Sequence, residues 1–165
     1  MLDLFAGSGA LGFEAMSRGA GSVVFVDNDA AAVMSIRRNA VRLLEDPNRW
    51  RIMPVSASRA LRTLRGTFDV VFVDPPYSRD AAEELTLLMQ RGLLAVSGIV
   101  VWEHAANAAA QLPGSMRVLK ETRYGSTALT FAVMRTDGRP EAADELVAAT
   151  KAQARMPARR RAAPA

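Results

Sequence analysis

The sequence predicts an α/β protein with a doubly wound, mainly parallel sheet that is closed by an antiparallel C-terminal hairpin. Three observations predict it. Over residues 2–102, runs of β-branched and apolar residues alternate with segments of helical spacing, which is typical of β-α-β units and a parallel sheet. A glycine-rich turn follows the first of these runs. Near the end, two strand-like runs are joined by Tyr124-Gly125-Ser126, a turn too short to hold a crossover helix.

The individual elements follow from the spacing of apolar residues. Strands are expected at residues 2–5, 22–26, 51–55, 68–73 and 98–102, each rich in Val, Leu, Ile or Phe. Helices are expected at 10–18, 30–44, 59–64 and 81–91, where apolar residues recur every three or four positions. The closing hairpin pairs residues 116–123 with 127–134. This order describes a Rossmann-like sheet with helices on both faces.

Length and composition indicate one folded domain and a tail. The chain has 165 residues, half of them hydrophobic, which is ordinary for a single soluble domain. We expect that domain at residues 1–138. Residues 139–165 are basic and contain few large apolar side chains, so we expect them to form a largely disordered tail.

Residue content excludes several kinds of site and location. The chain has no cysteine, and His104 is its only histidine, which excludes disulfides, thiolate metal sites and imidazole clusters. We expect no metal. No apolar run approaches the roughly 20 residues of a membrane span, and the first residues lack the pattern of a signal peptide. We therefore expect a cytoplasmic monomer that does not contact a membrane.

Basic charge is concentrated in one part of the predicted domain. The formal net charge is +4, and the segment from Arg37 to Arg65 holds eight arginines against Glu45 and Asp46. Such a segment is compatible with a surface that faces phosphates. It is equally compatible with a chain that is simply rich in arginine. Charge alone does not decide between these two interpretations.

The first motif is the glycine turn. Gly7, Gly9 and Gly12 have the G-x-G-x-x-G spacing directly after a predicted strand and directly before a predicted helix. Such glycines let the backbone approach a ligand, and the helix N-terminus offers free N–H groups to an anion. Asp27 ends the next strand, where a carboxylate can bind ribose hydroxyls. This motif alone fits a dinucleotide as well as any other nucleoside cofactor.

Asp3 helps to decide between these cofactors. Its carboxylate comes four residues before Gly7 and points toward the same crevice. A carboxylate there would repel a pyrophosphate but would attract an ammonium group. A cofactor that combines an ammonium, a carboxylate and a ribose fits this arrangement. That cofactor is S-adenosylmethionine.

The second motif is Asp74-Pro75-Pro76-Tyr77, at the end of the fourth predicted strand. Open α/β sheets bind their ligands at this edge. The two prolines fix the backbone, and together with Asp74 they present acceptors suited to a planar amine. Acceptors aimed at the N–H bonds would localise the nitrogen lone pair and stabilise the transition state of methylation. Tyr77 offers a flat face for a base taken out of its stack.

The two motifs together resemble a known family. The pairing of DLFAGSGALG with FDVVFVDPPY resembles the class I S-adenosylmethionine-dependent methyltransferases that modify exocyclic amines. It is most similar to the bacterial guanine-N2 methyltransferases of small-subunit (16S) ribosomal RNA, the RsmD type. The similarity covers about residues 2–134 and includes Glu14, Asn39, Glu103 and the hairpin turn.

The resemblance implies a role for each matching position. The cofactor would be bound by Asp3, Phe5, Ala6, Gly7, Ser8, Gly9, Asp27, Asn28, Ser56 and Ala57. Asp3 and the Gly7–Gly9 turn would hold its methionine end, and Asp27 its ribose. At Ser56-Ala57 the family usually has an acid or amide before the alanine, so adenine would be held more weakly here or through the backbone. Asp74, Pro75, Pro76 and Tyr77 would form the amine site, and the partner would be ribosomal RNA or an assembling small subunit.

Three other interpretations stay open. The Asp74 motif is shared by enzymes that methylate amines in DNA or other amine and amide substrates. A nicotinamide-dependent oxidoreductase shares the glycine turn but leaves Asp3, the Asp74 motif and the hairpin unexplained. The third is an inactive remnant, because the family has several dozen residues before the position of Met1. We therefore expect the domain to be N-terminally incomplete.

Overall fold

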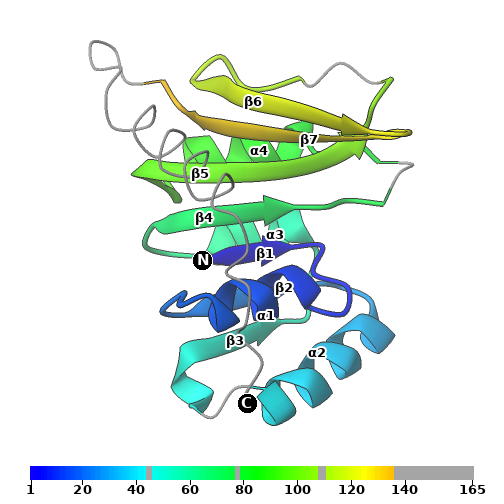
Figure 1. The fold of residues 1–165 in the computed structure, drawn as a ribbon. Coiled ribbons are helices and arrows are strands. Elements are labelled where there is room, and N and C mark those ends of the chain that lie inside the picture. The colour runs from blue at the N-terminus through cyan, green and yellow to red at the C-terminus, as the bar shows by residue number, and fades with distance from the viewer. Residues whose placement is uncertain (44–45, 77–78, 108–110, 136–165) are drawn as a thin grey trace, which may run out of the picture. The chain divides into compact units, whose positions relative to one another are not determined.

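The computed structural model describes residues 1–43, 46–76, 79–107 and 111–135, which form a seven-stranded sheet (Figure 1). The strand order is β3-β2-β1-β4-β5-β7-β6. The strands are β1 Leu2–Leu4, β2 Val23–Val26, β3 Trp50–Met53, β4 Phe68–Val73, β5 Leu94–Ala105, β6 Met116–Tyr124 and β7 Thr127–Met134. β1 to β5 pair in parallel, and β7 pairs antiparallel with both β5 and β6. This confirms the predicted doubly wound sheet and its closing hairpin.

Helices cover both faces of this sheet. They are α1 Ala10–Ser17, α2 Ala30–Leu43, α3 Ala57–Thr63 and α4 Ala82–Gln90, with a short 3-10 helix η1 at Pro47–Arg49. The side chains of β2 alternate between two cores. Phe25 packs with α1 and α2 residues, whereas Val26 packs in the core that contains α3 and α4 residues. This alternation is the period-two pattern of a strand buried on both faces.

β1 is short but central. Leu2 and Leu4 are fully buried, and the strand pairs with β2 on one side and β4 on the other. The chain leaves β1 toward β2 on one side, whereas the connection from β3 leads to β4 on the other side. The turn after β1 therefore lies at a topological switch point. Ligands of open α/β sheets bind at such points.

Several element boundaries differ from those expected, most of them by one or two residues, and β5 and α3 show why. β5 extends over Leu94–Ala105 rather than 98–102, because its last seven residues pair with β7 and its first residue pairs with Phe68 across an irregularity in β4. α3 begins at Ala57, two residues earlier than expected. The hydroxyl of Ser56 caps it by accepting a hydrogen bond of 3.3 Å from the backbone N–H of Arg59.

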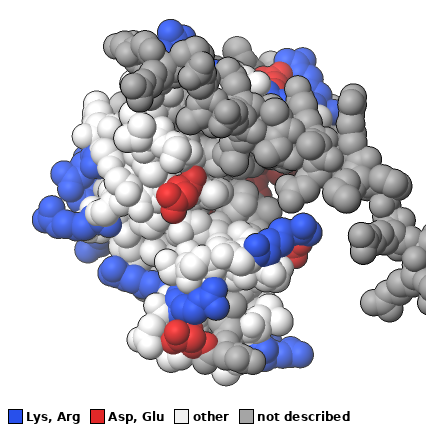
Figure 2. All heavy atoms as spheres, turned by 60° about the vertical axis from the view of Figure 1, so that its left-hand side comes forward, with Lys and Arg blue, Asp and Glu red and all other residues white. Residues whose placement is uncertain are grey.

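Some expectations concern residues that are not described. The tail expected at 139–165, the domain boundary at residue 138 and the side chain of Tyr77 all lie outside the described residues. In the part of the chain that is described, no helix is long and apolar enough to cross a membrane. Figure 2 shows several basic side chains at the left margin of the view and others at its right, bottom and top, whereas acidic side chains are scattered singly.

Candidate functional site

The register of the parallel strands brings four chain segments together at one edge. The residues that pair across the sheet there are Val26, Leu4, Val73 and Trp102. The position after each of them is the first beyond that aligned row, and these positions hold Asp27, Phe5, Asp74 and Glu103. The two predicted motifs and the end of β2 therefore lie side by side at the carboxyl edge of the sheet.

The glycine turn is shaped by backbone that only glycine adopts easily. Gly7 and Gly9 have φ angles of 54° and 81°, in the left-handed region. The N–H of Gly9 donates to the carbonyl of Ala6 at 2.7 Å, which closes the turn before α1. Gly12 is required for a different reason, since a Cβ built on it would lie 2.2 Å from the ring of Phe25. The third glycine of the motif therefore lets α1 pack against β2.

Asp3 lies beneath this turn and is almost completely buried, with 1% of its surface exposed. Its Oδ2 accepts a hydrogen bond of 3.0 Å from the N–H of Gly12. Burial raises the pKa of Asp3 from 3.8 to about 7, and the nearby carboxylates of Asp74 and Asp27 add to the increase, while the Gly12 bond opposes it. Asp3 is thus a buried acid that lacks a cationic partner among the described residues.

Asp27 holds the turn from the end of β2. Its Oδ2 accepts from the N–H of Gly7 at 2.8 Å, and its Oδ1 accepts from the N–H of Asp29 at 2.9 Å. Each carboxylate oxygen can accept a second bond, so the ribose role predicted for Asp27 is chemically compatible with these contacts. That role stays a prediction.

Asn39 was not among the predicted site residues, although the structure connects it to the turn. Its Nδ2 donates to the carbonyl of Ser8 at 3.1 Å, across 31 residues of sequence. Its position in the sequence indicates a residue that packs in a helix, and in the structure it lies on α2 between the buried Ile36 and Ala40. The signal available in the sequence was the family resemblance, which includes Asn39.

The segment after β4 begins beside the glycine turn. The N–H of Asp74 lies 3.5 Å from the carbonyl of Leu4, the last residue of β1. Partial burial raises the pKa of Asp74, and the carboxylate of Glu103 on β5 raises it further. Pro75 is buried, Pro76 is exposed, and the Pro76 carbonyl accepts from the N–H of Arg79 at 2.8 Å. One of the acceptors predicted for the amine site, the Pro76 carbonyl, therefore closes a turn within the protein.

Three predicted cofactor residues lie at the ends of β2 and β3. Asn28 is exposed directly after Asp27, and Ala57 is buried at the start of α3. Ser56 is half-buried and caps α3. This capping role explains the serine without a ligand, so the part of Ser56 and Ala57 in adenine binding stays a prediction.

The site is strongly acidic. Asp3 interacts electrostatically with Asp74 and Asp27, and Asp74 interacts with Glu103. A sheet edge that carries several carboxylates attracts cations and repels a pyrophosphate. Glu103 therefore belongs to the site electrostatically. The sequence alone indicates only a charged residue at the end of a strand.

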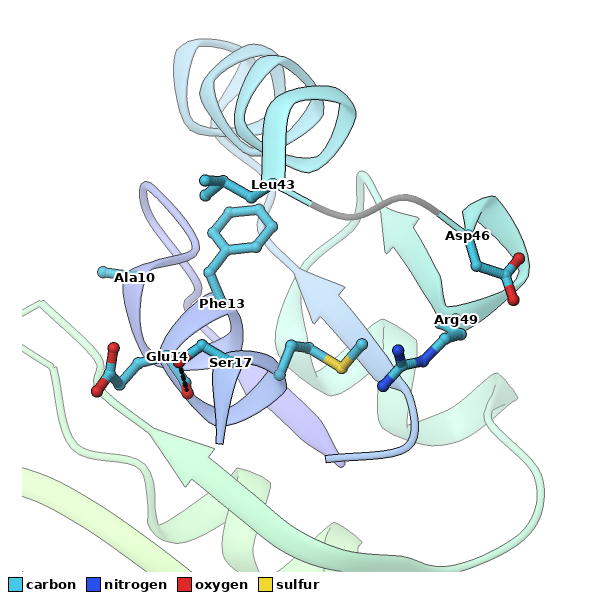
Figure 3. Close-up of a pocket in the computed structure, with 8 residues that line it drawn as sticks. Ala10, Phe13, Glu14, Ser17, Leu43, Asp46 and Arg49 are labelled. Carbon is cyan, nitrogen blue, oxygen red and sulfur yellow. Dashed lines mark hydrogen bonds between the residues drawn. The ribbon is translucent and has the colours of Figure 1, made fainter. Parts of the chain in front are cut away.

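A pocket of about 530 Å³ lies elsewhere, beside α1, the end of α2 and η1 (Figure 3). Phe13, Met16 and Leu43 contribute its apolar wall. Arg49 lines it as well, and its guanidinium donates to the carbonyls of Gly21 and Ala20 at 2.9 and 2.8 Å. This arginine holds the turn after α1, and the pocket shares no residue with the predicted cofactor or amine sites.

Comparison with known proteins identifies the family. A family model described as conserved hypothetical protein 95 matches residues 1–133. The chain belongs to this family. The match covers both motifs, all seven strands except the last residue of β7, and every predicted site residue.

Individual relatives agree with this assignment. The chain is 38% identical over 137 residues to YlbH of Bacillus subtilis, whose name proposes an rRNA methyltransferase, and the match covers 79% of this chain and 73% of YlbH. It is 31% identical over 143 residues to ribosomal RNA small subunit methyltransferase D of Escherichia coli, covering 86% and 71%. A solved structure from Streptococcus pyogenes superimposes with a TM-score of 0.75 at 34% identity, covering 81% and 84%.

Proposed function

We propose that the protein transfers a methyl group from S-adenosylmethionine to the exocyclic N2 amine of a guanine in small-subunit ribosomal RNA. The observation that carries the proposal is the acidic carboxyl edge at which the glycine turn meets Asp74. The relatives named ribosomal RNA small subunit methyltransferase D supply the substrate. The reaction would take place in the cytoplasm, where ribosomal subunits are assembled.

The residues present fit this cofactor. Its ammonium and sulfonium groups are positive, and Asp3 is a buried carboxylate that is stabilised by one N–H donor from Gly12. The first N–H groups of α1 have no partner within the helix and suit the cofactor carboxylate. Asp27 would bind the ribose hydroxyls. When bound, the cofactor supplies an electrophilic methyl group.

Asp74 is the residue proposed to act on the amine. A guanine N2 lone pair is delocalised into the ring, so the nitrogen becomes nucleophilic only when its N–H bonds are drawn toward acceptors. The Asp74 carboxylate accepts one of them, and it takes up the proton that the nitrogen loses as the N–C bond forms. Its raised pKa, caused by partial burial and by Glu103, makes it a better proton acceptor. Tyr77 would provide the stacking face for the base.

An exposed stripe on α2 supports a nucleic-acid partner. Arg37, Arg38 and Arg42 are exposed, and no ion pair joins them to an acid in the described ranges. Met34 and Val41 on the same helix expose 67% and 73% of their surfaces. Arginines without acidic partners can replace the counterions of a phosphate backbone, and they indicate where RNA outside the amine site would contact the protein.

Two measurements test this function. Titration calorimetry should show that S-adenosylhomocysteine binds and that NADH does not. Radiolabelled methyl transfer to small-subunit RNA should fall about 10²- to 10³-fold in Asp74→Ala, because one pre-aimed acceptor is lost, while the affinity for S-adenosylhomocysteine changes little. Asp69→Ala is the matched control, since Asp69 is an exposed carboxylate near the other end of the same strand.

The outcomes separate the alternatives. Binding of NADH alone would favour a nicotinamide-dependent enzyme over a methyltransferase. Methyl transfer to DNA but not to RNA would retain the chemistry and change the substrate. Near wild-type transfer by Asp74→Ala would show that Asp74 does not act on the amine.

A further inference from the structure

Arg79 connects the amine segment after β4 to the cofactor turn after β1. Its guanidinium carbon lies 5.3 Å from the centre of the Phe5 ring, within the range of a cation–π contact. Its backbone N–H donates to the carbonyl of Pro76 at 2.8 Å. One residue therefore contacts both segments that the proposed reaction must hold in register.

A buried carboxylate holds this arginine in place. Glu84 on α4 forms an ion pair with the Nη2 of Arg79, and 1% of the Glu84 side chain is exposed. Its second oxygen, Oε2, is buried and has no hydrogen-bond partner among the residues that the structure describes. A buried carboxylate is costly and contributes little net stability even when paired. The position of Glu84 is therefore better explained by what it orients than by stability.

Phe5 is an unusual residue to find at the other end of this contact. It has a φ of 59°, the only positive φ of a non-glycine residue in the described part of the chain. Residues other than glycine adopt this backbone conformation only at a steric cost, and such residues cluster at functional sites. Arg79 packs on the ring of Phe5, so the guanidinium is placed to keep the turn in this conformation.

A neighbouring ion pair shows that charge pairing alone does not explain the arrangement. Arg62 on α3 and Glu83 on α4 pair at 3.3 Å, with 61% and 60% of their side chains exposed. No contact of this pair reaches either segment of the site among the described residues. It has the same chemistry as Arg79–Glu84 but lies on the surface.

We propose that Arg79 is a positioning residue which, anchored by Glu84, couples the conformation of the Phe5 turn to that of the Asp74-Pro75-Pro76 segment. This role rests on the proposed methyl transfer and deepens it. The backbone contacts between the two segments remain without the guanidinium, but the Phe5 ring loses its packing partner. The cofactor turn would then be less firmly held relative to the amine segment, and the methyl donor and the acceptor nitrogen would be misaligned. A misplacement of about 1 Å can cost about 10²-fold in rate.

The first test measures methyl transfer in four variants. Arg79→Ala should lower kcat about 10- to 100-fold with a change in the KM for RNA of less than about threefold. Arg79→Lys keeps the charge but lacks the planar guanidinium. It should therefore have the melting temperature of wild type but a kcat as low as that of Arg79→Ala. Glu84→Gln removes a buried charge, so it should lower kcat without lowering the melting temperature. Arg62→Ala should leave both unchanged.

A second test does not depend on activity. Hydrogen exchange of the ligand-free chain should show faster exchange of the amides of residues 5–9 in Arg79→Ala and no change there in Arg62→Ala. If the wild-type chain transfers no methyl group, the proposed function fails and hydrogen exchange alone decides the role of Arg79. Wild-type kcat in Arg79→Ala, full recovery of kcat by Arg79→Lys, or unchanged exchange of residues 5–9 would each overturn the proposal.

Discussion

Asp3→Asn should change how the stability of the ligand-free protein depends on pH. The substitution keeps an oxygen that can accept from the N–H of Gly12 but removes the charge. Burial raises the pKa of Asp3 from 3.8 to about 7, so the folded state holds its proton over a pH range in which the unfolded chain has released it. Stability therefore falls as the pH rises from about 4 to about 7.

The size of this effect follows from the shift. One pKa unit corresponds to about 1.4 kcal/mol, so a shift of about three units costs the folded state about 4 kcal/mol once Asp3 is ionised. We expect the free energy of unfolding of Asp3→Asn, relative to wild type, to increase by up to about 1.4 kcal/mol per pH unit between pH 4 and 7 and then to level off.

Urea unfolding of both proteins from pH 4 to 8 measures this difference. Asp69→Asn, at an exposed position of β4, shows how much an Asp-to-Asn change contributes by itself. A difference between Asp3→Asn and wild type that does not vary with pH would refute the buried-acid argument.

Cofactor binding gives a second readout, because an ammonium group binds the ionised acid. The affinity of wild type for S-adenosylhomocysteine should rise between pH 6 and 7, and the affinity of Asp3→Asn should be lower and nearly independent of pH.

Two further substitutions test the support of the glycine turn. Gly12→Ala places a methyl group 2.2 Å from the fully buried Phe25 ring and should lower the free energy of unfolding in urea by about 1–3 kcal/mol. Gly21→Ala, where a Cβ meets nothing within 4 Å, should change it by less than about 0.5 kcal/mol, and equal effects would contradict the packing argument. Asn39→Ala loses the bond to the Ser8 carbonyl, typically worth roughly 0.5–1.5 kcal/mol, and should weaken S-adenosylhomocysteine binding several-fold by calorimetry; an unchanged affinity would show that this anchor is dispensable.

The fold could be predicted because its signals are local. Strand runs, helical spacing and the glycine turn are each read within a few residues, and the order of elements then restricts the topology. The extent of β5 was missed because Ser97 and Gly98 interrupt its apolar run. Pairing of Leu94 with Phe68 of β4 extends the strand before this interruption, and pairing with β7 extends it at its other end to Ala105. Such long-range pairing is not visible in the local pattern.

The candidate site shows the same division. Asp3, Asp27 and Asp74 could be found because each stands directly in or after a recognisable motif. Asn39 and Arg79 could not, because their roles arise from contacts across 31 residues to Ser8 and across 74 residues to Phe5. Their residue types are ordinary for exposed or half-buried positions, and only the fold brings them to the turn.

The most direct test of the central claim is to identify the methylated nucleoside. Small-subunit RNA that lacks the modification, supplied both free and in assembled subunits, is incubated with the chain and S-adenosylmethionine, digested to nucleosides and analysed by mass spectrometry. We expect N2-methylguanosine with wild type and at least a hundredfold less with Asp74→Ala. Methyl groups found only on another nucleoside, or equal amounts of N2-methylguanosine with both proteins, would contradict it.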